Sequence, residues 1–364
     1  MISIGILAYN EEDSIETTLR SLARQTLLGW AASGEPVEVC VVANGCSDAT
    51  AARAEAFCRS AEMPGVRFRV CEVVERGKLN AWNRYVHEFA DADAATIVLM
   101  DADIVFRTAD ALQRLCDALR ASPTAVAASG LAYKDIELTG TRNPLLWLSG
   151  RLTRLRRHEP VAIVRGQLTA YKADVLRQLW LPPAMLAEEG YIKDLLVSDF
   201  LTAEPDPRRI LSVPAAGYVF QAYRRWKDIA SSQVRMRVGE FQRFVVMREL
   251  RRLKQAGLIQ SPVCQWVRQR HAENPAWLEQ LVARHVDECG FWVMGPHVLR
   301  HRLSEWRCRR GLGRWLTLPV ALAGSVGDTL LSFLANRKVK RGAHRTTDLW
   351  TDTRSADLKL EYAE

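Results

Sequence analysis

The sequence predicts an α/β protein: a mostly parallel, Rossmann-like sheet flanked by helices, followed by a helical C-terminal appendage. Over residues 1–130, apolar runs of strand length alternate with segments of helical spacing. These runs are continuously apolar, as expected of strands buried on both faces of a parallel sheet. From Asp228 onward the pattern is almost entirely helical.

The individual elements of the first part follow from this alternation. The first helix, for example, places Ile15, Leu19 and Leu22 on one face. Strands are predicted over Ile2–Ala8, Val37–Ala43, Val66–Val74, Thr96–Met100 and Ala125–Ala132. Helices are predicted over Ser14–Arg24, Ser47–Arg59, Lys78–Ala90 and Thr108–Ala121.

After residue 140 the pattern is less regular. We expect a basic helix over Pro144–Arg157, a pair of strands over Val161–Tyr171 that turns at Gly166, and a helix over Glu188–Leu201. The helices of the C-terminal part should be broken at Gly257, Pro262, Pro275 and Pro296.

Charge is unevenly distributed along the 364 residues, whose formal net charge is +8. Residues 221–345 hold 24 Lys/Arg against 9 Asp/Glu, and the rest of the chain holds 26 against 33. A basic part suggests an anionic surface or ligand. No nucleic-acid-binding motif is present, so an anionic membrane surface or a phosphate-bearing substrate is expected and nucleic acid is not.

Eight cysteines occur without a CxxC pair or zinc-ligand spacing, and the chain begins directly in a strand. These features predict reduced cysteines and a cytoplasmic protein.

Four polar segments follow the predicted parallel strands: Tyr9–Asp13, Asn44–Asp48, Glu75–Lys78 and Asp101–Asp103. Ligands of such sheets bind at the carboxyl ends of the strands, so these segments should converge. Asp101 and Asp103 offer two hard oxygen ligands suited to Mg²⁺ or Mn²⁺. A solvated turn is the alternative for an isolated Asp-x-Asp, but the strand before it and the other three loops favour a metal site.

These segments resemble family-2 glycosyltransferases, which have the GT-A fold, use nucleotide sugars and invert the anomeric centre. ISIGILAYNEEDSIETTLRSLARQ resembles the family's first strand, Y-N-E loop and first helix. VEVCVVANGCSDAT, VERGKLNAWNRYV and VLMDADIVF resemble the next three family segments, in the same order. The resemblance covers about residues 1–240. It implies a nucleotide-binding half at 1–130, an acceptor half at 131–240, a helical basic appendage at 241–345 and a polar tail at 346–364.

The resemblance also implies roles for single residues. Ala8, Tyr9 and Glu11 should line the nucleotide. Asn44 stands where the family usually has an aspartate facing the base, which leaves the identity of the base open. Lys78 should lie near the base or the phosphates, although an exposed lysine at a helix start is an alternative.

Further along the chain, the resemblance implies that Asp101 faces the ribose or the metal and that Asp103 is a direct metal ligand. Asp48 matches the second aspartate of its segment, and a helix cap is an equally good interpretation.

The catalytic base is expected in the segment LAEEGYIKDLL, where Glu188 and Glu189 occupy the position of a family Glu-Asp pair. Such a base removes the proton of the acceptor hydroxyl. Asp194 and Asp199 are nearby rivals. Acidic residues also favour the first turn of a helix for electrostatic reasons alone.

Two further segments match the family imperfectly. Gln221, Arg225 and Trp226 resemble its Q-x-x-R-W motif, which contacts the diphosphate, but the spacing is one residue too long. Gln233, Arg235 and Arg237 form a second imperfect match without Trp, and an Arg-rich surface helix is the alternative. Gly166 lies in a segment that resembles the one beside the donor sugar, or is a simple turn glycine.

Trp315–Leu334 is apolar, but Pro319 and Asp328 argue against a membrane-spanning helix. Basic, Trp-bearing flanks favour a helix at an anionic membrane surface, on the inner face of the cytoplasmic membrane. A buried helix pair is the alternative. The cations and tryptophans concerned are Arg302, Trp306, Arg307, Arg309, Arg310, Arg314 and Trp315.

The sequence therefore predicts a metal-dependent transferase that moves a sugar from a nucleoside-diphosphate sugar, with UDP favoured, to an acceptor hydroxyl that it does not identify. A nucleotidyltransferase of related fold is an alternative, but such enzymes open with a Gly-rich loop that AYNEEDS lacks. A catalytically inert sugar-nucleotide- or membrane-binding protein is a third possibility, against which the intact Asp101–Asp103 motif counts.

Overall fold

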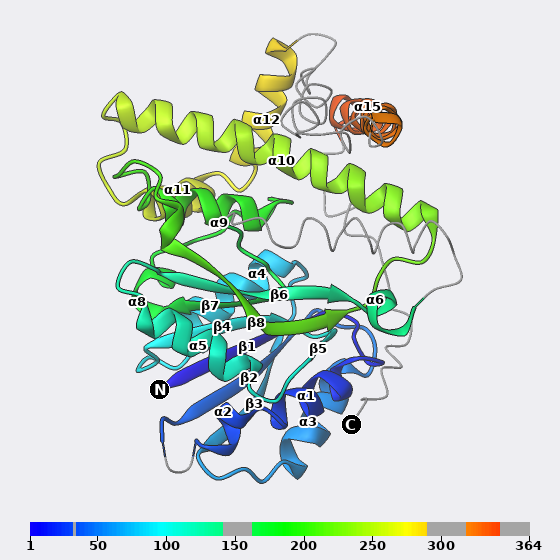
Figure 1. Cartoon of the computed structure of the whole chain (residues 1–364). Coiled ribbons are helices and arrows are strands. Elements are labelled where there is room, and N and C mark those ends of the chain that lie inside the picture. The colour runs from blue at the N-terminus through cyan, green and yellow to red at the C-terminus, as the bar shows by residue number, and fades with distance from the viewer. Residues whose placement is uncertain (32–33, 141–161, 290–317, 343–364) are drawn as a thin grey trace.

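The computed structural model describes residues 1–31, 34–140, 162–289 and 318–342 (Figure 1). Its strands are β1 (Ile2–Ala8), β2 (Val37–Asn44), β3 (Val66–Val73), β4 (Thr96–Asp101), β5 (Ile104–Phe106), β6 (Ala127–Lys134), β7 (Leu168–Lys172) and β8 (Ile210–Phe220). Its first α-helices are α1 (Ile15–Ala23), α2 (Thr26–Gly29), α3 (Thr50–Ser60), α4 (Lys78–Arg84), α5 (Ala111–Ala121), α6 (Asp135–Thr139) and α8 (Ala173–Leu176). The later ones are α9 (Glu188–Val197), α10 (Trp226–Gln255), α11 (Val263–Glu273), α12 (Trp277–Glu288) and α15 (Leu318–Lys340).

The described strands form one eight-stranded sheet in the order β3-β2-β1-β4-β7-β6-β8-β5. β3, β2, β1 and β4 are parallel neighbours, and β6 and β8 are also parallel. β7 runs antiparallel to both β4 and β6, and β5 runs antiparallel to β8. The predicted α/β fold with its helical C-terminal appendage is confirmed.

Helices cover both faces of the sheet. Side chains of α1, α2, α3 and α5 pack on one face, and those of α4 and α9 pack on the other. The long helix α10 and the helices α12 and α15 lie beyond α9, above the sheet in Figure 1, and α11 lies at about the level of α9. Gly5 in the buried strand β1 allows the ring of Tyr85 to lie directly against the backbone, since a Cβ there would come within 2.3 Å of that ring.

The parallel register brings the predicted loops to one edge. Ala8 is paired with Ala43 of β2, and Leu7 with Asp101 of β4. The segment after β1 therefore lies between the segments that follow β2 and β4. Asn10, Glu11 and Glu12 hydrogen-bond across to the second loop, and the Glu12 N–H donates to Asp48 at 3.2 Å.

Several predicted elements need correction. The strand pair over Val161–Tyr171 is wrong in its first half, because residues 162–167 form no strand and β7 pairs with β4 and β6 instead. The helix predicted over Glu188–Leu201 ends at Val197, and Asp199, Phe200 and Leu201 all have positive φ. The predictions did not include β5 or β8.

The helix predicted over Lys78–Ala90 continues beyond α4 as a π-helical turn, Tyr85–Phe89. The predicted breaks near Gly257, Pro262 and Pro275 are confirmed by the ends of α10, α11 and α12. Pro144–Arg157, Pro296, the tail at 346–364 and the basic cluster between Arg302 and Trp315 lie outside the described residues. Within the described part of the chain, no helix is long and apolar enough to cross a membrane.

Candidate active site

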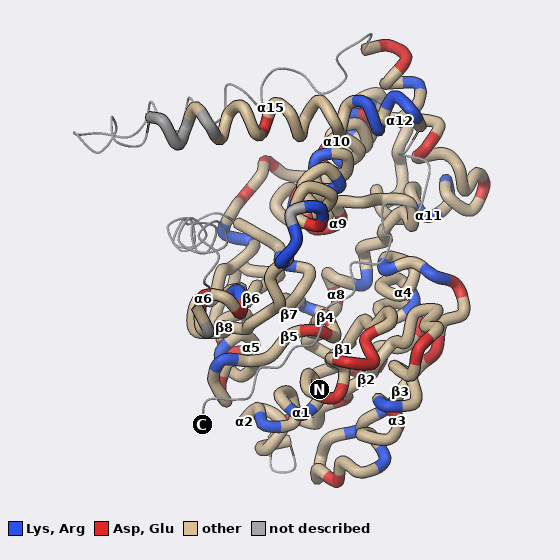
Figure 2. The backbone as a smooth tube through the Cα atoms, turned by 90° about the vertical axis from the view of Figure 1, so that its right-hand side faces the viewer, with Lys and Arg blue, Asp and Glu red and all other residues tan. Residues whose placement is uncertain are grey.

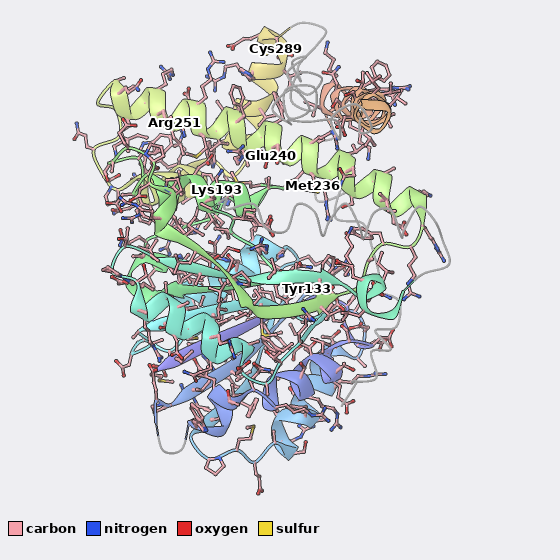
Figure 3. The ribbon with its side chains drawn as sticks, in the orientation of Figure 1. Tyr133, Lys193, Met236, Glu240, Arg251 and Cys289 are labelled. Atoms are coloured by element: carbon pink, nitrogen blue, oxygen red, sulfur yellow. The ribbon has the colours of Figure 1, made fainter. Side chains whose placement is uncertain are left out.

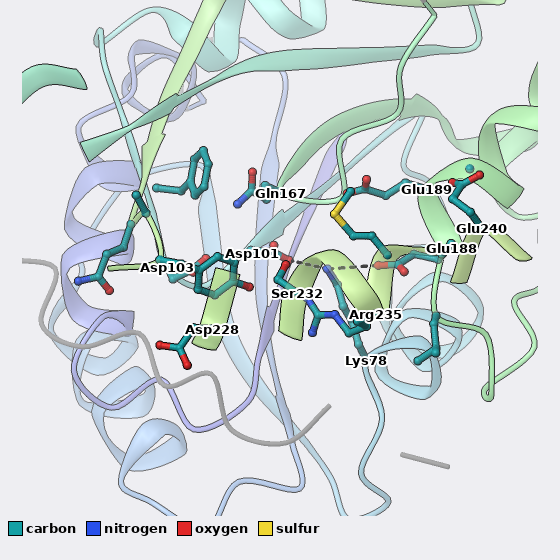
Figure 4. Close-up of a pocket in the computed structure, with 18 of the residues that line it drawn as sticks. Lys78, Asp101, Asp103, Gln167, Glu188, Glu189, Asp228, Ser232, Arg235 and Glu240 are labelled. Atoms are coloured by element: carbon teal, nitrogen blue, oxygen red, sulfur yellow. Dashed lines mark ion pairs between the residues drawn. The ribbon is translucent and has the colours of Figure 1, made fainter. Parts of the chain in front are cut away.

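A cleft of about 1040 Å³ opens at the carboxyl ends of the parallel strands (Figure 4). Asp101 and Asp103 line it next to Lys78, and Glu188 and Glu189 line it on the other side of Lys78. The amino-terminal half of α10 forms the opposite wall. The structure thus brings together groups from distant parts of the sequence, from the first loop to the start of α9.

Asp101 and Asp103 enter the cleft because the residue between them points the other way. Ala102 is buried, and its carbonyl accepts a hydrogen bond from the Thr18 hydroxyl of α1 at 2.8 Å. β5 begins immediately afterwards and pairs with β8. The turn is therefore held from both sides, with the two carboxylates on the same side of it.

Lys78 connects the two acidic parts of the cleft. Its Nζ lies 3.2 Å from Asp101 Oδ1 and 3.4 Å from Glu188 Oε1 (Figure 4). Burial alone would lower the pKa of this ammonium, but Asp101, Glu188 and Glu189 outweigh burial and raise it well above its usual value. Lys78 therefore stays charged and holds α4, β4 and α9 at fixed positions relative to one another.

Glu188 and Glu189 are the first residues of α9. Glu189 Oε1 accepts the N–H of Gly166 at 2.6 Å. Burial, with the neighbouring Glu188 as the second cause, raises the pKa of Glu189 to about 7. A carboxylate with that pKa can take up and release a proton near neutral pH, as a general base must.

The rival carboxylates lie elsewhere. Asp194 forms ion pairs with Arg243 and Lys193, and Asp199 pairs with Arg209 at 2.7 Å. Neither lines the cleft. The geometry therefore favours the Glu188–Glu189 pair as the source of the base.

Gly166 lies against this pair. A Cβ at this position would be 2.8 Å from Glu189 Oε1 and 3.4 Å from Lys78 Nζ. The absence of a side chain at Gly166 thus leaves room for the ends of the Glu189 and Lys78 side chains beside its backbone.

Glu11 adds a third carboxylate beside the Asp101–Asp103 turn. Burial raises its pKa to about 8, and the negative charge of Asp103 is the second cause. The Ser14 hydroxyl donates to Glu11 Oε2 and acts in the opposite direction. An excess of negative charge in a buried place is what a bound cation would neutralise.

A pH-dependent stability follows for Glu11. Because its pKa rises from 4.5 to about 8 on folding, its contribution to stability is present at low pH and is lost as the pH rises through 8. Glu11→Gln removes this titration. In metal-free buffer, the melting temperature of the variant relative to the wild type should increase by a few degrees between about pH 5 and about pH 9. A difference that is the same at both pH values would contradict the assignment.

The comparisons with known proteins point to one family. A sequence profile described as glycosyl transferase family 2 matches residues 3–180. Residues 3–180 form a glycosyl transferase family 2 domain. The chain therefore carries the domain of a family-2-like glycosyltransferase. No curated protein sequence matches the chain at a significant level.

Solved glycosyltransferase structures are similar to this chain at low identity. A mannosyltransferase from Pyrobaculum calidifontis, in complex with GDP-Man and Mn²⁺, is 18% identical with a TM-score of 0.49, covering 94% of this chain and 85% of its own. Glucosyl-3-phosphoglycerate synthase from Mycobacterium tuberculosis, in complex with Mn²⁺, UDP-glucose and phosphoglyceric acid, is 20% identical with a TM-score of 0.45. That likeness covers 67% of this chain and 79% of the synthase.

The residues expected near the base of the nucleotide form a separate group beside the cleft. Ala8 and Asn44 end β1 and β2 and are buried, and Asn44 Oδ1 has no hydrogen-bond partner within the described residues. The Arg76 guanidinium lies 6.0 Å from the centre of the Tyr9 ring. None of these side chains lines the cleft itself. Asp48 accepts the Thr50 N–H at 3.0 Å, but it is not the N-cap of α3, because that position is Ala49, which makes no side-chain cap hydrogen bond.

The glycosyltransferase also uses α10 to close its cleft. Gln221, Arg225 and Arg235 line it, and Trp226 is the first residue of the helix. Arg237 instead pairs with Asp328 of α15 at 2.7 Å. Of the two imperfect Q-x-x-R-W matches, each therefore contributes one arginine to the cleft.

The sequence predictions did not include several lining residues. Gln167 follows the Gly166 turn, and its backbone carbonyl accepts the Asp101 N–H at 3.2 Å. On α10 the missed residues recur at helical spacing, which could have identified them. They are Asp228, Ser232, Met236 and Glu240, of which Figure 3 labels Met236 and Glu240 on this helix.

The donor set suits a hard divalent cation. Asp101 and Asp103 offer carboxylate oxygens, which are the ligands that Mg²⁺ and Mn²⁺ prefer. Within the described residues, no group of three or more Asp, Glu, His or Cys side chains is placed to hold a metal. The protein would thus supply part of the coordination, with phosphate oxygens of a substrate completing it.

Proposed function

We propose that this glycosyltransferase moves a sugar from a nucleoside-diphosphate sugar, with a UDP-sugar as the first candidate, to an acceptor hydroxyl with inversion of the anomeric centre. One observation carries the proposal. Asp101–Asp103, suited to a metal and phosphates, and Glu188–Glu189, suited to proton transfer, face one cleft and are joined through Lys78.

In this proposal Glu189 removes the proton of the acceptor hydroxyl while its oxygen attacks the anomeric carbon. Gly166 orients Glu189 by donating its N–H, and Lys78 and Glu188 fix the start of α9. Asp103 and Asp101 would hold Mg²⁺ or Mn²⁺, which supplies Lewis-acid stabilisation of negative charge on the departing diphosphate. Arg225 and Arg235 are placed to bind phosphate oxygens.

Product analysis tests the reaction class. Purified protein with Mn²⁺ and a panel of UDP-, GDP- and TDP-sugars should release a nucleoside diphosphate and yield a product of inverted anomeric configuration. Release of pyrophosphate would instead indicate a nucleotidyltransferase, and a retained configuration would remove the role of Glu189 as a base for direct displacement. Binding of the preferred donor should also raise the melting temperature.

The domain division and the location of the enzyme are part of the same proposal. Residues 1–240 would carry donor and acceptor binding and 241–345 the basic appendage, although α10 runs through residue 240 without a break. The basic C-terminal part would hold the enzyme at an anionic membrane surface, on the inner face of the cytoplasmic membrane.

A further inference from the structure

The helix α15 packs on the side of α10 that faces away from the sheet (Figures 1 and 2). Arg237 of α10 and Asp328 of α15 form an ion pair of 2.7 Å, with 18% and 14% of their side chains exposed. This pair, together with the buried Ala335 and Val339, fixes which side of α15 faces the protein.

The distribution of polar residues on α15 differs from that of an ordinary surface helix, which turns its apolar stripe towards the core and its polar residues towards water. The side packed on the protein carries Ser325, Ser332 and Asn336, which are 6%, 2% and 2% exposed. Among the described side chains of α15, Leu331 and Val339 also pack on the protein, but most of the large apolar residues lie on the other side. Leu322, Val326, Leu330, Phe333 and Leu334 are 50%, 62%, 60%, 42% and 45% exposed.

These five residues form a continuous surface, here called the α15 stripe. At about 100° per residue they fall within an arc of about 120° around the helix axis. Scattered exposed apolar side chains are normal on a protein, but a contiguous row marks a surface that another apolar phase covers.

Two arginines lie within the same arc of the helix as the α15 stripe. Arg337 and Arg341 are exposed and project from it one and two turns beyond Leu334, where the Arg341 N–H still donates to the Arg337 carbonyl at 3.2 Å. The acidic residue of α15, Asp328, lies on the opposite side against Arg237. In Figure 2 the helix is accordingly tan along most of its length, in contrast to α10.

We propose that the α15 stripe is the surface by which this protein lies on an anionic lipid bilayer. The leucines, valine and phenylalanine would enter the boundary between headgroups and acyl chains, with the helix axis in the membrane plane. Arg337 and Arg341 have flexible stems that reach the lipid phosphates from the same side.

Charge argues against a second copy of the chain as the occupant. The centres of protein interfaces are depleted of charge. Pairing two α15 stripes in parallel would set the arginines of one copy against those of the other. Antiparallel pairing would set Arg337 and Arg341 against the Leu322 end of the partner helix. A lipid surface accommodates both the apolar and the cationic part of the arc.

Vesicle co-sedimentation of the full chain tests the proposal without requiring catalysis. Wild-type protein should bind vesicles of phosphatidylcholine mixed with phosphatidylglycerol more strongly than vesicles of phosphatidylcholine alone, and more weakly at high salt. Val326→Glu/Leu330→Glu should lower binding to both by roughly tenfold or more. Arg337→Glu/Arg341→Glu should weaken the preference for the anionic vesicles, and an unchanged preference would contradict the role of these two arginines.

Leu258→Glu is the matched control, since Leu258 is 62% exposed but lies between α10 and α11, and it should bind as the wild type does. Wild-type binding by Val326→Glu/Leu330→Glu would overturn the proposal, as would absence of binding by the wild type. Sedimentation velocity covers the remaining alternative. A wild-type dimer that this variant converts to a monomer, without vesicle binding, would make the stripe a subunit interface.

Discussion

Replacing Asp103 by asparagine is expected to reduce sugar transfer by about a hundredfold or more while the protein remains folded. The amide is a poorer ligand for a hard cation than the carboxylate it replaces. Asp103 is chosen over Asp101 because Asp101 also pairs with Lys78, so its substitution would disturb α4 as well. Steady-state release of nucleoside diphosphate, with a melting curve for each protein, provides the measurement.

The chain provides a matched control for this substitution. A second Asp-Ala-Asp occurs at residues 91–93, before β4 rather than after it, and Asp93 is exposed. Asp93→Asn makes the same chemical change at the opposite end of the same strand and should leave transfer unchanged. Near wild-type activity of Asp103→Asn, or full wild-type activity in the presence of a chelator, would rule out the metal role of this turn.

Glu189→Gln should also cost about a hundredfold or more in turnover, which is the usual scale of a lost general base. Donor affinity should stay close to normal, because the glutamine keeps an oxygen that can accept the Gly166 N–H. Turnover measured at saturating donor, together with donor binding by calorimetry, separates the two effects.

The pH profile makes this second prediction more specific. The pKa of Glu189 is raised to about 7, and the base works in its ionised form. Wild-type turnover should therefore fall by about tenfold per pH unit below pH 7 and level off above it. The residual activity of Glu189→Gln should not show this fall below pH 7.

Asp199→Asn is the control, because Asp199 pairs with Arg209 outside the cleft. If Asp199→Asn or Asp194→Asn abolished turnover and Glu189→Gln did not, Glu189 would not be the catalytic base. Glu189→Asp, which introduces the residue expected from the resemblance, should retain part of the activity.

The sequence by itself was sufficient for the parallel half of the sheet and for its acidic turn. β1, β2 and β4 are mainly apolar runs, interrupted in β1 by Ser3 and in β2 by Glu38, and neighbouring parallel strands must end at one edge. That combination placed Asp101 and Asp103 beside the loop after β1.

Only the tertiary structure decided the other half of the site. β8 went unpredicted because Pro214 and Gly217 interrupt its apolar pattern, and it is held by pairing with β6, a strand far from it in the sequence. Lys78 and Glu188 are likewise distant in the sequence, and the contact of Gly166 with Glu189 joins a turn to a helix start. The raised pKa of Glu189 exists only in that packed environment. A buried strand can be predicted from the sequence because its apolar residues follow one another along the chain. Ion pairs and desolvation depend on partners that are distant in the sequence and that only the fold brings near.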